Sequence, residues 1–188
     1  IAEHMSWQLL EEMSEWEEET DRLLHILPIV GCAFRKTYFE TAERRNFDVL
    51  TQAQDLTINY WAKSMETAPR LTEAMKFYPS EIEEHMRAGV WITHAFGPAT
   101  GAGEDEDAPH AFLEQHRRLD LDQDGYAEPY IVTVLKETQK VVRIVARYDA
   151  QDDPIRVSGR TGKIIKIEPV HYYTKFDFLP NSQGGIYG

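Results

Sequence analysis

The segment 116–148 constrains the fold of this chain more than any other part of its sequence. Two apolar runs, 130–135 and 141–148, flank the polar residues 136–140. A short apolar run, a polar turn and a second apolar run together predict a β-hairpin. In the second run apolar side chains alternate with arginines, which predicts a strand with one dry face and one wet face. The dry face comprises Val142, Ile144, Ala146 and Tyr148, and the wet face carries Arg143 and Arg147.

Residues rich in Asp and Gly directly precede this hairpin. Asp120, Asp122 and Asp124 occupy alternate positions, and Gly125 follows them. This spacing is typical of the first half of a calcium-binding loop, because alternate carboxylates converge on one hard cation and the glycine permits a sharp turn. The pattern therefore makes the three aspartates candidate metal ligands.

The second half of the calcium-loop pattern is missing. Ile131 stands at the twelfth position, where an EF-hand places a bidentate Glu, and Glu128 is the one further carboxylate. The alternative is a turn in which the Asp side chains accept hydrogen bonds from nearby backbone N–H groups. We favour the turn. The competing interpretation is a calcium site formed by Asp120, Asp122, Asp124 and Glu128.

The first 30 residues predict an amphipathic helix. Apolar side chains recur three and four positions apart over 5–27, and acidic side chains occupy the opposite face. We expect one long helix of roughly six turns, packed through Met13, Trp16 and Leu23. Pro28 is expected to end it, because proline cannot donate a backbone hydrogen bond.

Short β-rich segments follow the helix. The polar residues 40–54 predict a loop, and a capping box of Ser80 and Glu83 predicts a short helix that ends at Gly89. Together these elements predict an α+β fold, with the long helix packed on mostly antiparallel sheets. Besides the hairpin, strands are predicted at 29–39, 56–60, 163–168 and 172–179, and an extended or mixed segment is predicted at 71–77.

The acidic, Gly- and Pro-rich segment 96–110 is the clearest break in the pattern. It has few apolar residues to repay the entropy of ordering, so we expect a mobile surface loop. The loop separates residues 1–95, the helix and first β-rich segment, from residues 111–188, the hairpin-rich segment. Both are expected to belong to one domain.

The charge of the chain is uneven. It has 188 residues, 42% of them hydrophobic, and a formal net charge of −12. Residues 1–110 hold 21 acidic and 9 basic side chains, whereas 111–188 hold 11 of each. So acidic a region lacks the basic surface that nucleic-acid binding requires, and no DNA-binding residue is identified. No apolar run reaches the ~20 residues of a membrane span, and the single Cys32 is expected to be buried rather than reactive.

The sequence contains no motif of a known enzyme class. It has no phosphate-binding glycine loop, nucleophile elbow, HExxH motif or paired CxxC, so we expect a protein that is not an enzyme. His110 and His116 flank Glu114, but we expect these three residues to decorate the surface rather than to bind zinc. The weakest alternative is a metal-dependent hydrolase that uses Asp120, Asp122 and His116.

A series of short motifs runs along nearly the whole chain in a fixed order. The motifs are Trp16-Glu17-Glu18, Asp21-Arg22-Leu23-Leu24, 27–38, Asn59-Tyr60-Trp61-Ala62, 66–70, Leu119-Asp120-Leu121-Asp122, Asp124-Gly125, 128–132, Phe178-Leu179-Pro180-Asn181 and 184–188. In this order they resemble the portal proteins of tailed bacteriophages, of the short-tailed type. The part that they resemble is the wing, an α+β region that projects outward from the portal channel.

The resemblance implies a structural subunit of the ring, usually of twelve copies, at one vertex of the phage head. Double-stranded DNA passes through such a ring during packaging and ejection. The implied partners are other copies of the subunit, the terminase packaging motor, the capsid, and tail or head-completion proteins, with no membrane. The implied location is the virion, after assembly in the host cytoplasm. A stem helix normally follows a Gly-Gly-aromatic-Gly sequence in these proteins, so we expect the chain to stop where that helix begins.

Overall fold

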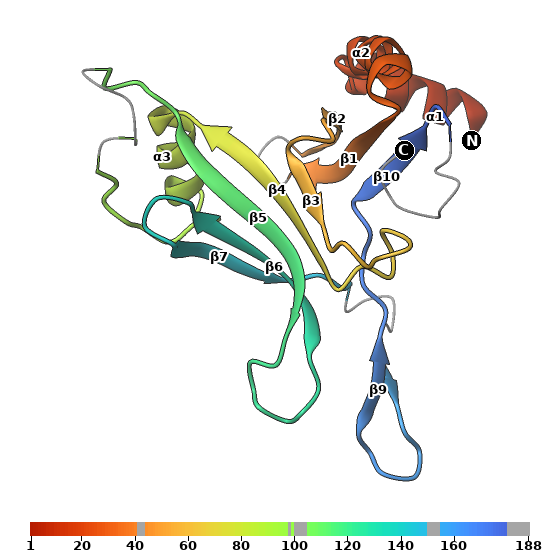
Figure 1. Cartoon of the computed structure of the whole chain (residues 1–188), viewed down its shortest axis with the longest axis vertical. Coiled ribbons are helices and arrows are strands. Elements are labelled where there is room, and N and C mark those ends of the chain that lie inside the picture. The colour runs from red at the N-terminus through yellow and green to blue at the C-terminus, as the bar shows by residue number, and fades with distance from the viewer. Residues whose placement is uncertain (41–43, 98, 100–104, 150–154, 180–188) are drawn as a thin grey trace. The chain divides into compact units, whose positions relative to one another are not determined.

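The computed structural model describes residues 1–40, 44–97, 99, 105–149 and 155–179. The chain forms two compact units: unit 1 comprises Ile1–Ala68 and His171–Gly188, and unit 2 comprises Pro69–Val170 (Figure 1). This division does not follow the predicted segments 1–95 and 111–188. The mobility expected of loop 96–110 concerns residues that lie partly outside the described ones. Of its described positions, His110 begins a strand and the others belong to no helix or strand.

Unit 1 begins with three short helical segments in place of the single long helix that we predicted. They are α1 (Ala2–Trp7), one stretch of π-helix, η1 (Gln8–Glu12), and α2 (Trp16–Val30). Met13 leaves the helical conformation, with φ −100° and ψ 69°. Its N–H still bonds to the Gln8 carbonyl oxygen, and its own carbonyl accepts the Trp16 N–H, each at 2.9 Å. The apolar spacing continues across this break, so the spacing alone could not reveal it.

The packing that we predicted for this region is largely confirmed. Met13 and Leu23 are buried, and Trp16 is half-buried. Pro28, however, lies inside α2 and does not end it. Only one backbone hydrogen bond is lost there, in the last turn, where the helix can tolerate the loss. The helix instead ends at Gly31, whose φ of 89° suits glycine and whose N–H bonds to the Leu27 carbonyl oxygen at 2.9 Å.

A three-stranded antiparallel sheet completes the core of unit 1. Its order is β10 (Tyr173–Asp177), β1 (Cys32–Glu40), β2 (Arg45–Thr51). A further short strand, β3 (Leu56–Ile58), follows. The prediction of a loop at 40–54 is therefore wrong, because β2 lies there. Cys32, as expected, is buried.

A buried ion pair joins the two longer strands of this sheet. The Arg35 Nη2 atom lies 2.8 Å from Asp48 Oδ2. Arg35 Nη1 also donates to the Thr20 hydroxyl of α2 at 2.9 Å, and the Thr37 hydroxyl donates to Asp48 Oδ1 at 3.0 Å. The guanidinium carbon lies 5.8 Å from the centre of the Trp16 ring. One arginine thus connects α2 to both strands.

Unit 2 contains an antiparallel sheet with the order β4-β5-β6-β7, which confirms the predicted α+β class with antiparallel pairing. The hairpin of β6 and β7 is the one that the segment 116–148 predicts. A separate two-stranded ribbon, β8 paired with β9, follows it. The bounds are β4 Arg70–Phe77, β5 His110–Leu119, β6 Glu128–Leu135, β7 Lys140–Ala146, β8 Ile155–Val157 and β9 Ile164–Ile167.

The face that we predicted for the second hairpin strand is only partly correct. Val142 is fully buried, but Ile144 is exposed. The pairing register of β6 and β7 shifts between Thr133 and Val134. Such a bulge inserts one residue and exchanges the faces of the strand on either side of it, so the regular alternation in the sequence does not survive in the structure.

The helix α3 (Pro79–Arg87) covers one end of the sheet of unit 2 (Figure 1). Its capping contact is made by Glu81, whose carboxylate accepts the Tyr78 N–H at 2.7 Å, not by the predicted Ser80 and Glu83. Gly89 does follow the helix end, with φ 71°. The core beneath comprises Ile82, Trp91, Phe112, Leu135 and Val142. None of the helices among the described residues combines the length and hydropathy of a membrane span.

Candidate functional site

The three predicted aspartates lie together in the loop between β5 and β6. One carboxylate oxygen from each of Asp120, Asp122 and Asp124 lies within 4.8 Å of the others, and all three side chains are exposed. Among the described residues, no other group of three or more His, Cys, Asp or Glu side chains has this proximity. The alternate spacing in the sequence therefore predicted the cluster correctly.

The loop is held by bonds from its own backbone to these carboxylates. The Gly125 N–H donates to Asp120 Oδ2 at 3.1 Å, and the Tyr126 N–H donates to Asp124 Oδ1 at 2.7 Å. Asp122 Oδ1 accepts the Asp124 N–H at 3.3 Å. Gly125 has φ 92°, a conformation that favours glycine. These are the side-chain-to-backbone bonds that the turn interpretation predicts.

Glu128, the fourth tentative ligand, points to a different partner. It is the first residue of β6, and its carboxylate accepts a hydrogen bond from the Tyr130 hydroxyl, two positions along the same strand. This bond, together with desolvation, raises the pKa of Tyr130 to about 12, because ionising the phenol would lose the bond to a carboxylate. Glu128 does not belong to the group of three aspartates.

The chemistry of the loop follows from its oxygen atoms. Carboxylate oxygens suit hard cations such as Ca²⁺, which take six to eight oxygen ligands. Three exposed carboxylates supply too few for a tight site and leave most of the coordination to water. The same cluster of negative charge also attracts lysine or arginine side chains, at a strength that salt reduces.

The histidines of β5 do not lie where we predicted them. His110, Glu114 and His116 are buried and share one face of the strand, so the expectation of surface positions is wrong. Their even spacing along a strand already places them on one side, which the sequence could have indicated. The His116 Nε2 atom lies 3.2 Å from Glu114 Oε1. His116 is not in the carboxylate cluster with Asp120 and Asp122, and so the arrangement does not assemble the hydrolase alternative.

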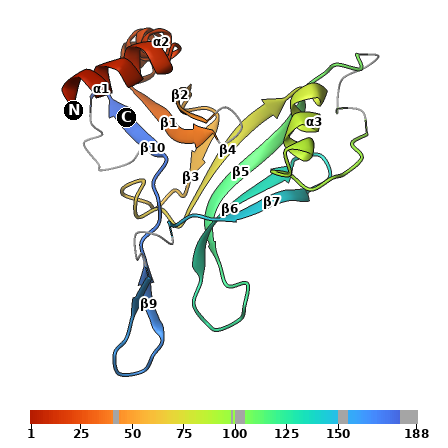
Figure 2. The ribbon, with the colours of Figure 1, turned by 180° about the vertical axis from the view of Figure 1, so that it is seen from behind.

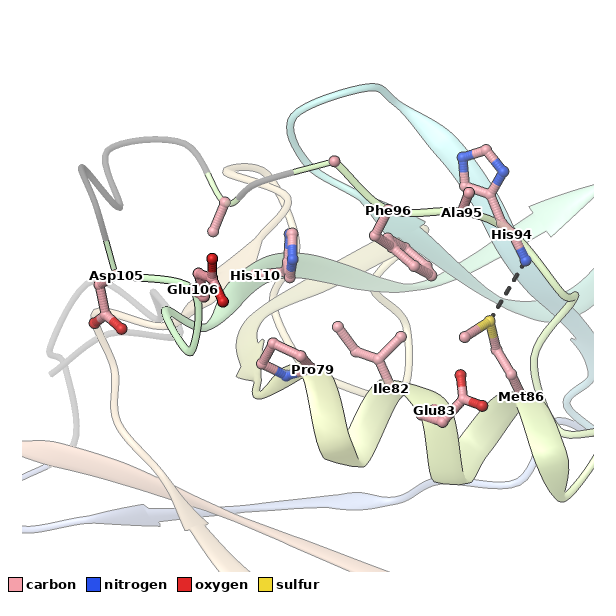
Figure 3. Close-up of a pocket in the computed structure, with 12 residues that line it drawn as sticks. Pro79, Ile82, Glu83, Met86, His94, Ala95, Phe96, Asp105, Glu106 and His110 are labelled. Carbon is pink, nitrogen blue, oxygen red and sulfur yellow. Dashed lines mark hydrogen bonds between the residues drawn. The ribbon is translucent and has the colours of Figure 1, made fainter.

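The sequence did not predict a pocket of about 430 Å³ beside α3. Figure 3 shows Ile82 and Met86 on α3 and Phe96 across from them. Glu83 and Glu106 lie at its rim, although Glu83 is paired with Arg87 at 2.7 Å. The pocket can hold a small apolar group. The described residues of its lining include the carboxylates of Glu83, Asp105 and Glu106 and the imidazoles of His94 and His110.

Comparison with protein families and with individual proteins gave no further assignment. No protein-family model matches the chain, and no curated protein sequence matches it.

Calcium distinguishes the two interpretations of the aspartate loop. If the loop is only a turn, millimolar calcium will leave the melting temperature unchanged, and Asp122→Ala will cost roughly 0.5–1.5 kcal/mol at most. If it binds calcium, the affinity without a bidentate Glu will be on the order of 10⁻⁴–10⁻³ M, and the ion will raise the melting temperature. Thermal melts with and without calcium measure the difference.

The matched control for this experiment is Asp107→Ala, another exposed carboxylate in unit 2. We expect no calcium-dependent shift in any of the three proteins. A shift in the wild type and in Asp107→Ala that disappears in Asp122→Ala would contradict the turn interpretation.

Proposed function

We propose that this chain is a region of the ring-forming subunit of a tailed-bacteriophage portal, equivalent to the wing. The proposal rests chiefly on the ordered motifs that resemble portal proteins. Two of the longest, 27–38 and 128–132, fall within regular elements: the first covers the end of α2 and most of β1, and the second opens β6. They therefore belong to the helices and strands of the two units and not to surface loops.

Large apolar side chains on the first three helical segments support a role in assembly. Several are exposed, and burying them would stabilise contact with another protein surface. A ring subunit has a neighbour on each side, so it needs such surfaces. The exposed residues are Met5, Trp7, Leu10, Leu24, Ile29 and Val30.

The proposed role assigns the chain no chemical step. Double-stranded DNA would pass through the channel of the assembled ring, and the terminase motor, the capsid and tail or head-completion proteins would dock on it. An acidic wing is compatible with this role, because a surface that repels phosphate does not retain the moving DNA.

Electron microscopy of the protein encoded by the complete reading frame tests the proposal. We expect class averages of rotationally symmetric rings with a central hole, usually of twelve subunits. A preparation that contains only monomers at micromolar concentration would contradict it.

The 188-residue chain by itself should behave differently from such a ring. We expect it to be monomeric or weakly associated at micromolar concentration, because ring closure adds many contacts that are each insufficient alone. Light scattering measures the molar mass. A stable dodecamer of this chain would show instead that this region drives assembly.

A second candidate is a calcium-binding, β-rich adhesion or interaction module. The observation that favours it is the proximity of Asp120, Asp122 and Asp124. The calcium melts described above test it directly.

A further inference from the structure

The ribbon of β8 and β9 presents an unusual surface for an acidic protein. Residues 155–167 carry four basic side chains and no acidic one, on a chain whose net charge is −12. The ribbon also exposes large apolar side chains, with Val157 53% and Ile165 62% accessible. The basic residues are Arg156, Arg160, Lys163 and Lys166.

Backbone hydrogen bonds close the turn at the tip of this ribbon. The Ser158 N–H bonds to the Lys163 carbonyl oxygen at 2.9 Å, and the Gly162 N–H bonds to the Ser158 carbonyl oxygen at 2.8 Å. Gly162 has φ 68°, as a tight turn requires. An isolated two-stranded ribbon is marginally stable in water, so its exposed apolar faces favour a partner.

The positive charge of the ribbon is concentrated at its tip. Glu168 lies 2.6 Å from Lys166 Nζ and 3.4 Å from Arg156 Nη2, and so offsets the charge at the base. Within the described part of the chain, neither Arg160 nor Lys163 forms an ion pair. An acidic surface with some apolar character would complement this tip.

The aspartate loop, residues 120–125, is acidic and partly apolar, and it projects from the same end of unit 2 as the ribbon. The Ile167 N–H donates to the Tyr126 hydroxyl at 2.9 Å, which joins the base of the ribbon to the end of the loop. Beyond these bases the two segments extend separately in both views (Figures 1 and 2). The loop carries three carboxylates together and exposes Leu121, which is 52% accessible.

We propose that the β8–β9 ribbon of one copy of this chain docks on the aspartate loop of a second copy. Arg160 and Lys163 would meet Asp122 and Asp124, while Ile165 and Val157 would cover Leu121. The exposed apolar side chains favour a protein partner over nucleic acid, since phosphate recognition does not use them.

In the proposed ring the contact is heterologous: the ribbon of one copy meets the loop of the next copy. Docking leaves a ribbon free at one end and a loop free at the other, so the contact repeats until a ring closes. The inference therefore rests on the proposed ring and names one interface within it. The ribbon and the loop lie at one end of unit 2, so neighbours related by rotation would present them at the same height.

Complementary charge reversal tests this contact. One variant carries Arg160→Glu and Lys163→Glu, and the other carries Asp122→Lys and Asp124→Lys. Sedimentation equilibrium of the 188-residue chain in low salt should detect weak self-association of the wild type. Each variant alone should associate at least about tenfold more weakly, and an equimolar mixture should recover the association as mixed dimers.

Several outcomes would overturn the proposal. These are a wild type that does not associate at millimolar concentration, variants that associate like the wild type, and a mixture that recovers nothing. Thermal melts verify that each variant is folded, and 0.5 M salt should weaken the wild-type contact. If calcium rather than a ribbon occupies the loop, the mixture will fail and calcium will raise the melting temperature.

Failure of this contact can be distinguished from failure of the portal proposal. If the protein from the complete reading frame forms rings, and the Arg160→Glu, Lys163→Glu variant forms them too, the ribbon contact is wrong and the portal proposal is unaffected. If the wild-type protein forms no rings, the portal proposal is wrong, whatever the charge-reversed variants do.

Discussion

Replacing Asp48 with alanine will destabilise unit 1 by about 3–5 kcal/mol, the cost of leaving a buried charge without its partner. The side chains of Arg35 and Asp48 are only 7% and 12% accessible, and their charged atoms lie 2.8 Å apart. Without Asp48 the guanidinium keeps its bond to Thr20 and loses its counter-charge. Among the described residues the Nε atom of Arg35 has no hydrogen-bond partner, and Nη2 would keep only its 3.4 Å bond to the backbone carbonyl of residue 48, which carries no compensating charge.

Urea unfolding followed by tryptophan fluorescence measures this loss, because Trp16 lies beside Arg35. The control is Glu83→Ala, which removes an ion pair to Arg87 on the surface of α3. Exposed pairs contribute roughly 0–1 kcal/mol, so this variant should unfold nearly as the wild type does. Equal losses for Asp48→Ala and Glu83→Ala would contradict the importance that we assign to burial.

The double variant Arg35→Met with Asp48→Leu separates the charge from the packing. Apolar side chains of similar volume often replace a buried ion pair at no cost or with a gain in stability. We therefore expect the double variant to be more stable than Asp48→Ala. If both are equally unstable, the loss comes from altered packing of α2 on the sheet and not from the unpaired charge.

Prediction from the sequence was most accurate for elements whose residue pattern fits only one secondary structure. Two β-rich runs around a polar turn could form little other than the hairpin of β6 and β7, and the structure has it. The strand β2 was missed because its sequence, RNFDVLT, mixes polar and apolar residues, and its buried Asp48 is satisfied by an arginine on the neighbouring strand. Whether such a segment forms a strand depends on partners that are distant in sequence.

The helix break at Met13 and the bulge in β7 are alike in one respect. Met13 is buried where the helix is interrupted, and Val142 is buried beside the register shift. At both places the backbone departs from regular geometry while the apolar side chain stays inside. Periodicity reports which side chains are buried and not how the backbone achieves it.

The candidate site was predictable where its geometry is local. Asp120, Asp122 and Asp124 are close in space because they are close in sequence. Glu128 stays an untested fourth ligand, and its carboxylate accepts a hydrogen bond from Tyr130, which strand geometry places on the same face two residues away. The pocket beside α3 combines residues from three separate segments and left no local pattern in the sequence.

Phe112→Ala will cost unit 2 about 3–5 kcal/mol, which is typical of a large aromatic removed from a packed core. Phe112 is fully buried on β5, where the helix α3 covers the sheet. Its ring centre lies 4.7 Å from that of Trp91 and 5.6 Å from that of Phe77. The variant would lose both the transferred apolar area and these ring contacts, and rigid neighbours could fill the cavity only in part.

Two further variants make the Phe112 measurement specific. Phe112→Leu keeps most of the volume and should lose clearly less than the alanine variant. Phe39→Ala removes a ring of the same kind from an exposed position in unit 1 and should change stability by no more than about 0.5 kcal/mol. Near-ultraviolet circular dichroism reports the surroundings of Trp91, so its signal should weaken in Phe112→Ala and not in Phe39→Ala. A loss below about 1 kcal/mol for Phe112→Ala would mean that α3 and the sheet close over the cavity, and that this core is far more plastic than its ring packing indicates.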